Sequence, residues 1–145
     1  MKKIKSLKLS PPSHEIYSQL DHILGSPDFH ASPNQIAFLK FVIDQTLSGK
    51  TCEIKGYTVA TRVFGRGPEF DQRVDPIVSL QASRLRVALE QYYLTAGKYD
   101  SIRIDIPKGT YVPTFDRIRD IKPERRFQND GVVKPEKIST SPILL

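Results

Sequence analysis

The chain has 145 residues, of which 39% are hydrophobic, and its formal net charge at pH 7 is +6. A chain of this length can bury one hydrophobic core but not two. Its longest apolar run, Ile36 to Ile43, is too short to cross a bilayer and is broken by Lys40, so no membrane-spanning segment is predicted in this chain.

The positive charge lies mainly at the two ends of the chain. Residues 1–9 contain four lysines and no acid, and residues 116–145 contain seven basic and five acidic residues. Residues 10–115 hold eleven of each, so this part is neutral. Both flanks also lack sustained hydrophobic periodicity. We therefore predict a basic N-terminal arm over residues 1–11, one folded domain over residues 12–116 and a flexible C-terminal tail or linker over residues 117–145.

Three helices are predicted in the first half of the domain. The first covers His14 to Leu24, where apolar residues recur on one side. Ser32 and Pro33 suit the N-cap and the first turn of a second helix, which Gly49 ends. A third, short helix is predicted from about Tyr57 to Phe64, and its expected inward residues are Val59, Ala60, Val63 and Phe64.

The longest amphipathic segment is predicted to form a helix from roughly Pro76 to Thr95. Asp75 is its expected N-cap, and Gly97 is the expected left-handed residue just past its C-terminal end. The expected core-facing stripe recurs at helical spacing and consists of Val78, Ala82, Leu85, Leu89 and Tyr92. The opposite side carries Leu80, Ser83, Arg84 and Val87, with Ser79 and Arg86 on its flank.

This opposite side has the residue types of a DNA-contacting surface. Ser and Arg side chains contact phosphates, and Arg also reads guanine edges. Leu80 and Val87 could meet thymine methyl groups or a partner protein. The alternative is that this is simply the central helix of a small core, with arginines at its edge that extend their charged ends into water.

A β-hairpin is predicted directly after this helix. Three isoleucines alternate with polar residues in the period-2 pattern of a half-buried strand: Ile102, Ile104 and Ile106. The predicted turn is Pro107 to Thr110, in which Gly109 takes a positive φ. The return strand is predicted from Tyr111 to Phe115, and Pro113 would confine it to a sheet edge. Lys108 and Thr110 are expected at the tip, where they would touch DNA phosphates.

This helix and hairpin carry two family resemblances. RLRVALE (residues 84–90), followed by a strand that ends in KGTYVPTF, resembles the DNA-binding domain of OmpR-type response regulators, although the second glycine of that family's hairpin signature is missing. From Ile23 to Phe115 the sequence is similar to a bacterial winged-helix domain that precedes transmembrane, adenylate-cyclase-like, TolB-like or tetratricopeptide regions. The segments that carry this second resemblance are FGR, FDQRVDPIV, RLR and PKGTY.

The resemblances imply an α+β fold of the winged helix-turn-helix type, a small helical bundle with a C-terminal hairpin wing. They imply a cytoplasmic bacterial transcription regulator that binds double-stranded DNA. The loop of residues 65–73 would then contact RNA polymerase or another protein, and a homodimer is a further expectation. The predicted DNA-contacting residues are Arg73, Ser79, Leu80, Ser83, Arg84, Arg86, Lys108 and Thr110. The alternative function is a protein–protein interaction module on the same scaffold, which the neutral charge of the domain favours.

No catalytic, metal or cofactor site is predicted, so an enzyme is not expected. His14, His22 and His30 do not have metal-ligand spacing with Cys52 or with nearby carboxylates, and His22 is expected to face solvent. Asp71 and Asp75 are interpreted as a loop contact and an N-cap rather than as a catalytic pair. The single cysteine is typical of a reducing compartment.

Overall fold

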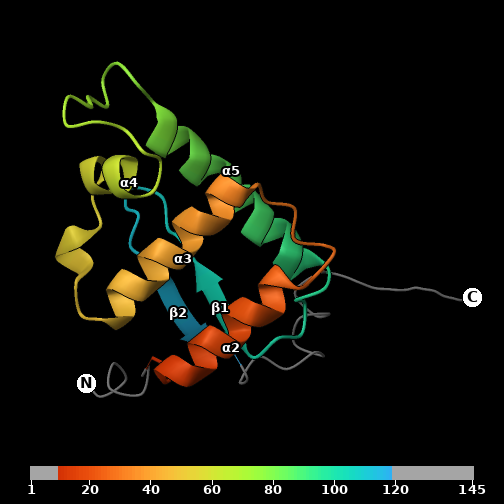
Figure 1. Cartoon of the computed structure of the whole chain (residues 1–145). Helices are drawn as coiled ribbons and strands as arrows, with labels where there is room; N and C mark the ends of the chain where they lie inside the picture. Colours follow the sequence, from red (N-terminus) through yellow and green to blue (C-terminus); the bar gives the residue numbers. More distant parts are fainter. Residues whose placement is uncertain (1–9, 119–145) are drawn as a thin grey trace, which may run out of the picture.

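A computed structural model describes residues 10–118, so residues 1–9 of the predicted arm and residues 119–145 of the predicted tail lie outside the description, whereas Arg117 of the predicted tail belongs to the second strand of the sheet. The described chain folds into helices and one small antiparallel sheet (Figure 1), which confirms the predicted α+β class. In chain order the elements are α2 (Ser13–Leu24), α3 (Pro33–Leu47), the 3₁₀-helix η1 (Thr51–Glu53), α4 (Gly56–Arg62), α5 (Ile77–Leu94), β1 (Ile102–Asp105) and β2 (Thr114–Arg117). None of the helices between residues 10 and 118 is long and apolar enough to cross a bilayer.

The helices before α5 begin and end close to the predicted positions. Ser32 caps α3 through a capping box, in which its hydroxyl accepts from the Gln35 backbone N–H and the Gln35 side chain accepts from the Ser32 N–H. Gly49 follows the C-terminal end of this helix with φ of 76°. The short helix α4 ends at Arg62 and not at the predicted Phe64, but Phe64 still packs against the core.

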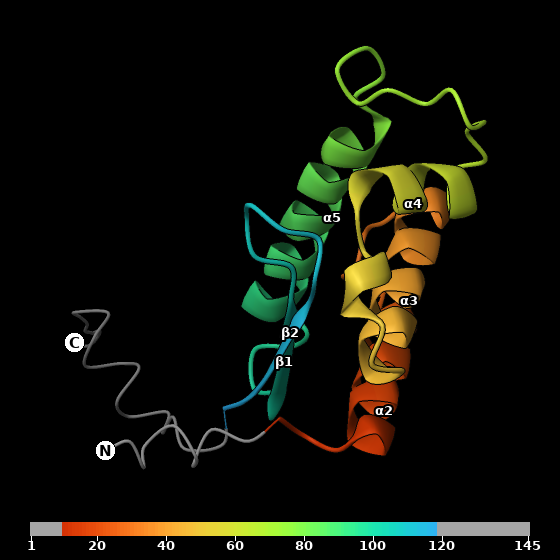
Figure 2. The same cartoon turned by 90° about the vertical axis from the view of Figure 1, so that its left-hand side faces the viewer.

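One hydrophobic core lies between the helices and the inner face of the hairpin. The helix α3 packs against α5, and α4 packs against the same helix. Figure 2 shows α5 and the hairpin side by side, with α3 and α4 on the opposite side of the molecule. The predicted core-facing stripe of α5 is confirmed, since all five of its side chains are buried: Val78, Ala82, Leu85, Leu89 and Tyr92. Helical period alone therefore identified which face of α5 points inward.

Both predicted end signals of α5 are wrong in detail. The N-cap position is occupied by Pro76, while Asp75 stands one residue earlier and its carboxylate accepts from the Ile77 N–H at 3.2 Å. Gly97 does not have a positive φ, a conformation that Gly49, Gly65 and Gly109 adopt among the described glycines. Gly97 is instead buried against the ring of Tyr92, where a Cβ would lie 2.2 Å from the ring carbon Cε2. It is the missing side chain at residue 97, and not its backbone freedom, that the fold requires.

The hairpin has a shorter return strand than predicted. β1 pairs with β2 in a register that places Ile104 opposite Phe115, and Gly109 adopts the predicted positive φ of 91° in the connecting loop. The return strand starts at Thr114, three residues after the predicted Tyr111. The ring of Tyr111 packs against Phe38, with ring centroids 5.8 Å apart, and the residue before β2 is a proline, which has no N–H for the ladder. These contacts hold the segment between the turn and Thr114 outside the sheet.

The outer edge of β1, which faces away from β2, obtains hydrogen-bond partners from α5. The buried hydroxyl of Tyr93 donates to the Ile102 carbonyl and accepts from the Ile104 N–H, each at 2.9 Å. Arg103 lies over the Tyr93 ring, 4.9 Å from its centroid. A side chain of the helix thus satisfies backbone groups that a neighbouring strand would otherwise pair.

This buried hydroxyl makes the stability of the domain sensitive to alkaline pH. Burial raises the pKa of Tyr93 from its ordinary value of 10 to about 12. Because the unfolded chain ionises this tyrosine first, its contribution to stability is complete below pH 10 and is lost as the pH rises to about 12. In urea unfolding at pH 8, 10 and 11, we expect a steeper loss of stability above pH 10 in the native protein than in Tyr93→Phe. Equal slopes for the two proteins would contradict this assignment.

Candidate functional site

The outward face of α5 carries the small polar and apolar side chains that the sequence placed there. Ser79, Ser83 and Arg84 are exposed. Leu80 and Val87 are 43% and 56% exposed, which is high for large apolar side chains. The Ser79 hydroxyl donates to the Pro76 carbonyl at 3.2 Å, so its oxygen remains able to accept a hydrogen bond. This face is open to a partner along the first three turns of the helix.

Arg84 is the cation of this face that is free to bind. Within residues 10–118 it has no hydrogen-bond or ion-pair partner, and its side chain is exposed. A guanidinium group has five donors and a planar shape, so it can bind phosphates or the acceptor edge of a guanine. Arg84 therefore presents an unused multidentate donor on the exposed face.

Arg86 is placed differently from Arg84, although both were predicted to contact DNA. It is half-buried, and its guanidinium donates to three backbone carbonyls of the hairpin loop. Nε bonds the carbonyl of Ile106 at 2.7 Å, and Nη2 bonds those of Pro107 at 3.2 Å and Thr110 at 2.9 Å. We call this arrangement, Arg86 with the carbonyls of residues 106, 107 and 110, the hairpin latch.

The hairpin latch brings the tip of the hairpin beside the middle of α5. Lys108 and Thr110 are both exposed there, as predicted. The Thr110 hydroxyl accepts from the Val112 N–H at 3.1 Å, and within residues 10–118 the Lys108 ammonium has no partner. The exposed hairpin tip is thus held against α5 by Arg86. Within residues 10–118 the tip carries one unpaired cation, Lys108, and the outward face of α5 carries another, Arg84.

The loop before α5 carries charges that are already paired. Arg73 is 90% exposed, but its guanidinium bonds both oxygens of Asp71, at 3.1 and 3.0 Å, and this hydrogen bonding lowers the pKa of the Asp71 carboxyl. Arg66 bonds Asp75 at 2.7 Å and lowers the pKa of that carboxyl in the same way. Exposed pairs of this kind are weak and exchange readily with other partners. Arg73 can therefore contact a phosphate only by leaving Asp71.

The loop of residues 65–73 is packed onto α4. Tyr57 stacks near Phe70, with ring centroids 6.4 Å apart, and its hydroxyl donates to the Pro68 carbonyl. Gly56 allows close approach, because a Cβ there would lie 2.2 Å from the side chain of Gln72. Val74, 80% exposed, is the most exposed of the large apolar side chains in residues 10–118.

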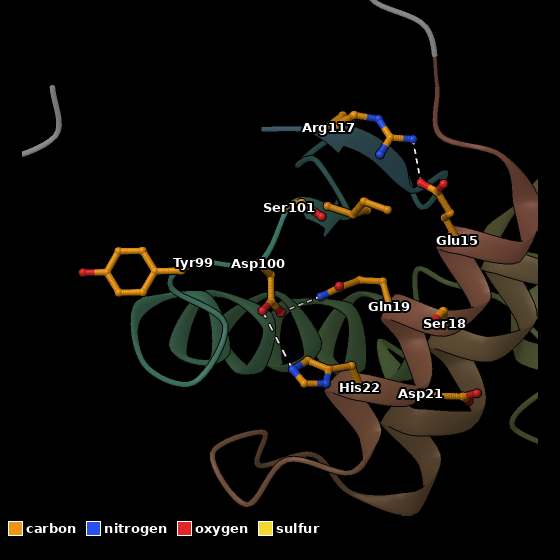
Figure 3. A pocket seen from close by; sticks show the side chains of 10 residues that line it. Glu15, Ser18, Gln19, Asp21, His22, Tyr99, Asp100, Ser101 and Arg117 are labelled. Atoms are coloured by element: carbon orange, nitrogen blue, oxygen red, sulfur yellow. Dashed lines mark hydrogen bonds and ion pairs between the residues drawn. The ribbon is translucent and has the colours of Figure 1, made fainter. Parts of the chain in front are cut away.

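A polar cluster at the far end of the domain was not predicted. The carboxylate of Asp100 accepts from the Tyr92 hydroxyl. It also accepts from Gln19 Nε2 at 2.8 Å, and His22 Nε2 lies 3.8 Å away (Figure 3). Burial, followed by the hydrogen bond to Asp100, raises the pKa of Tyr92. His22 faces solvent as predicted, but its pairing with Asp100 joins residues too far apart in sequence for any local pattern to signal. The cluster ties α2 to the segment between α5 and β1.

Other chemistry-bearing residues remain apart. Cys52 is exposed and unpaired, and within residues 10–118 no three His, Cys, Asp or Glu side chains are close enough to hold a metal ion. Comparison with known proteins found no matching family model, no similar curated protein and no similar solved structure. The family resemblances given by the sequence motifs therefore stay predictions.

Proposed function

We propose that this domain is a winged helix-turn-helix module that binds double-stranded DNA, with α5 as the recognition helix and the hairpin as the wing. The observation that supports this most directly is that an exposed hairpin tip is held against α5 by Arg86, while the outward face of the same helix is also exposed. The major groove of B-DNA is wide enough to admit an α-helix. A hairpin fixed beside that helix would lie over the neighbouring backbone.

The free side chains of this surface have distinct roles in the proposal. Arg84 would bind a guanine edge or a phosphate, Ser79 and Ser83 would bind phosphates, and Lys108 would hold the backbone beside the groove. Leu80 and Val87 would contact thymine methyl groups. Because residues 10–115 are neutral as a whole, binding relies on these few cations and on the lysines of residues 1–9. We therefore expect an affinity that falls steeply with salt.

The test is binding of the full chain to a random 20–30 base-pair duplex, about the length of two to three helical turns, over a salt series. Arg84→Ala is expected to weaken binding by about 1–3 kcal/mol, because it removes the free guanidinium of this face. Lys40→Ala is the matched control, since it also removes one exposed positive charge but lies on α3. Equal effects of the two substitutions would contradict the assignment of α5 as the reading helix.

A second variant separates the folded domain from its arm. Replacing the four lysines of residues 1–9 by alanine removes their charge without shortening the chain. Under the proposal this lowers affinity and the salt slope but leaves the effect of Arg84→Ala in place. If the lysine variant loses all binding and Arg84→Ala has no effect, the DNA contact belongs to the arm alone.

A second candidate function is a protein-interaction module on the same scaffold. Three large apolar residues stand seven positions apart on α5, namely Leu80, Val87 and Leu94, and they are 43%, 56% and 62% exposed. Such a stripe follows one side of a helix and is typical of a protein contact. Absence of DNA binding by the full chain at low salt would favour this second function.

A further inference from the structure

Arg86 is bonded to the hairpin in a way that limits what else it can bind. A guanidinium has one N–H on Nε and two on each terminal nitrogen. The hairpin latch occupies Nε once and Nη2 twice, so only Nη1 keeps free donors. A bidentate contact with a guanine needs two neighbouring nitrogens of the guanidinium. Arg86 would have to release the hairpin to make one.

The latch continues a row of contacts between α5 and the hairpin. Tyr93, seven residues after Arg86 and on the same side of the helix, bonds the Ile102 carbonyl and the Ile104 N–H. Arg86 bonds the carbonyl of Ile106, one residue past the end of β1, and the carbonyls of Pro107 and Thr110, which flank the hairpin tip. The strand is thereby held at one end by Tyr93 and the tip by Arg86.

We propose that Arg86 is a positioning residue, which fixes the hairpin tip beside α5 and contributes to DNA binding through Lys108 rather than by touching DNA itself. The proposal rests on the proposed function of the surface. Its structural half, the fixing of the tip, can be tested without DNA. Its functional half predicts that Arg86 and Lys108 act as one unit, whereas Arg84 acts independently of both.

The structural half is tested by trypsin. The bond after Lys108 lies in the exposed tip, and the bond after the 90% exposed Arg73 gives an internal reference in the same chain. In Arg86→Gln we expect cleavage after Lys108 to speed up at least about tenfold relative to cleavage after Arg73, because bonds to a charged donor hold the tip closed. Arg84→Ala, the control, should leave the ratio unchanged. An unchanged ratio in Arg86→Gln overturns the latch.

Arg86→Lys keeps the positive charge but replaces the planar fork by a single nitrogen, which cannot span carbonyls from residue 106 to residue 110. We expect its cleavage ratio to lie between those of the native protein and Arg86→Gln. If circular dichroism shows that Arg86→Gln does not fold, the cleavage ratio of Arg86→Lys takes its place as the test of the latch. Full protection of the tip by lysine would show that charge alone, and not the latch geometry, holds the hairpin.

The functional half is tested by a double-mutant cycle on duplex binding. Lys108→Ala should weaken binding and reduce the salt slope by about 1 in the native background. In the Arg86→Gln background, Lys108→Ala should change Kd by less than about twofold. In the Arg84→Ala background, Lys108→Ala should change Kd by as much as it does in the native background. If the fold-changes in Kd caused by Arg86→Gln and Lys108→Ala multiply in the double variant, the two residues act independently. That result would overturn the positioning role and indicate direct contact by Arg86.

The two experiments fail separately. Faster cleavage of the tip in a chain that binds no duplex would overturn the proposed function and the DNA role of Arg86, while the latch itself would stand. Unchanged cleavage in a chain that binds duplex would overturn the latch alone.

Discussion

Truncating Phe38 to alanine is expected to lower the free energy of unfolding by about 3–5 kcal/mol, the range for a buried phenylalanine. Phe38 is fully buried on α3, and its ring meets the edges of Phe64 and Tyr111, with centroids 5.6 and 5.8 Å away. It therefore joins three parts of the chain: α3, the residue pair that follows α4, and the hairpin loop. Small domains have free energies of unfolding of about 5–15 kcal/mol, so this substitution would remove a large part of the stability of the domain.

The measurement is urea unfolding followed by circular dichroism, with Phe38→Leu as the matched control. Leucine keeps most of the buried volume, and we expect it to cost less than about 1.5 kcal/mol. The slope of free energy against urea should stay the same in both variants if the folded and unfolded states keep their compactness. A loss below about 1.5 kcal/mol in the alanine variant would show that the core closes over the cavity.

Replacing Gly97 by alanine is the second change with a large expected effect, about 3 kcal/mol of lost stability from overpacking. The new Cβ would lie 2.2 Å from the Tyr92 ring. That ring has little room to move, because it is fully buried, meets Tyr93 at a centroid distance of 5.0 Å and bonds Asp100 through its hydroxyl. Either the ring or the turn after α5 must shift.

Gly49→Ala is the control for this substitution. Gly49 has a φ of 76° but open space around its Cβ position, so alanine there suffers backbone strain alone, which costs about 1–2 kcal/mol. Thermal and urea unfolding of both variants give the comparison. If Gly97→Ala costs no more than Gly49→Ala, the close packing of residue 97 against Tyr92 is not what the fold requires.

Local patterns predicted the local structure. The inward face of α5 followed from helical period, the start of α3 from Ser32 and Pro33, and the conformation of Gly109 from turn chemistry. The errors lie where a residue's role depends on a distant contact. Gly97 has the sequence position of a helix end signal, and no local pattern shows that the ring of Tyr92, five residues earlier on α5, packs against it.

The candidate site was predictable to the same extent. Exposure of Ser83, Arg84 and Val87 followed from their position opposite the buried stripe. Arg86 lies on the flank of that face, where the helical angle does not decide between solvent and a neighbour. Its partners are carbonyls 20 to 24 residues away, and backbone carbonyls leave no signature in a sequence. The pairing of His22 with Asp100 escaped prediction for the same reason.

The way α5 holds the hairpin has a consequence for variation of the loop sequence. Arg86 and Tyr93 bind backbone atoms: four carbonyls and a single N–H, that of Ile104. Every amino acid has a carbonyl, and only proline lacks the N–H. The hydrogen bonds by which α5 holds the tip therefore do not involve the side chains of Lys108 and Thr110. We therefore expect that a substitution at Lys108 changes what the tip contacts without changing how α5 holds it.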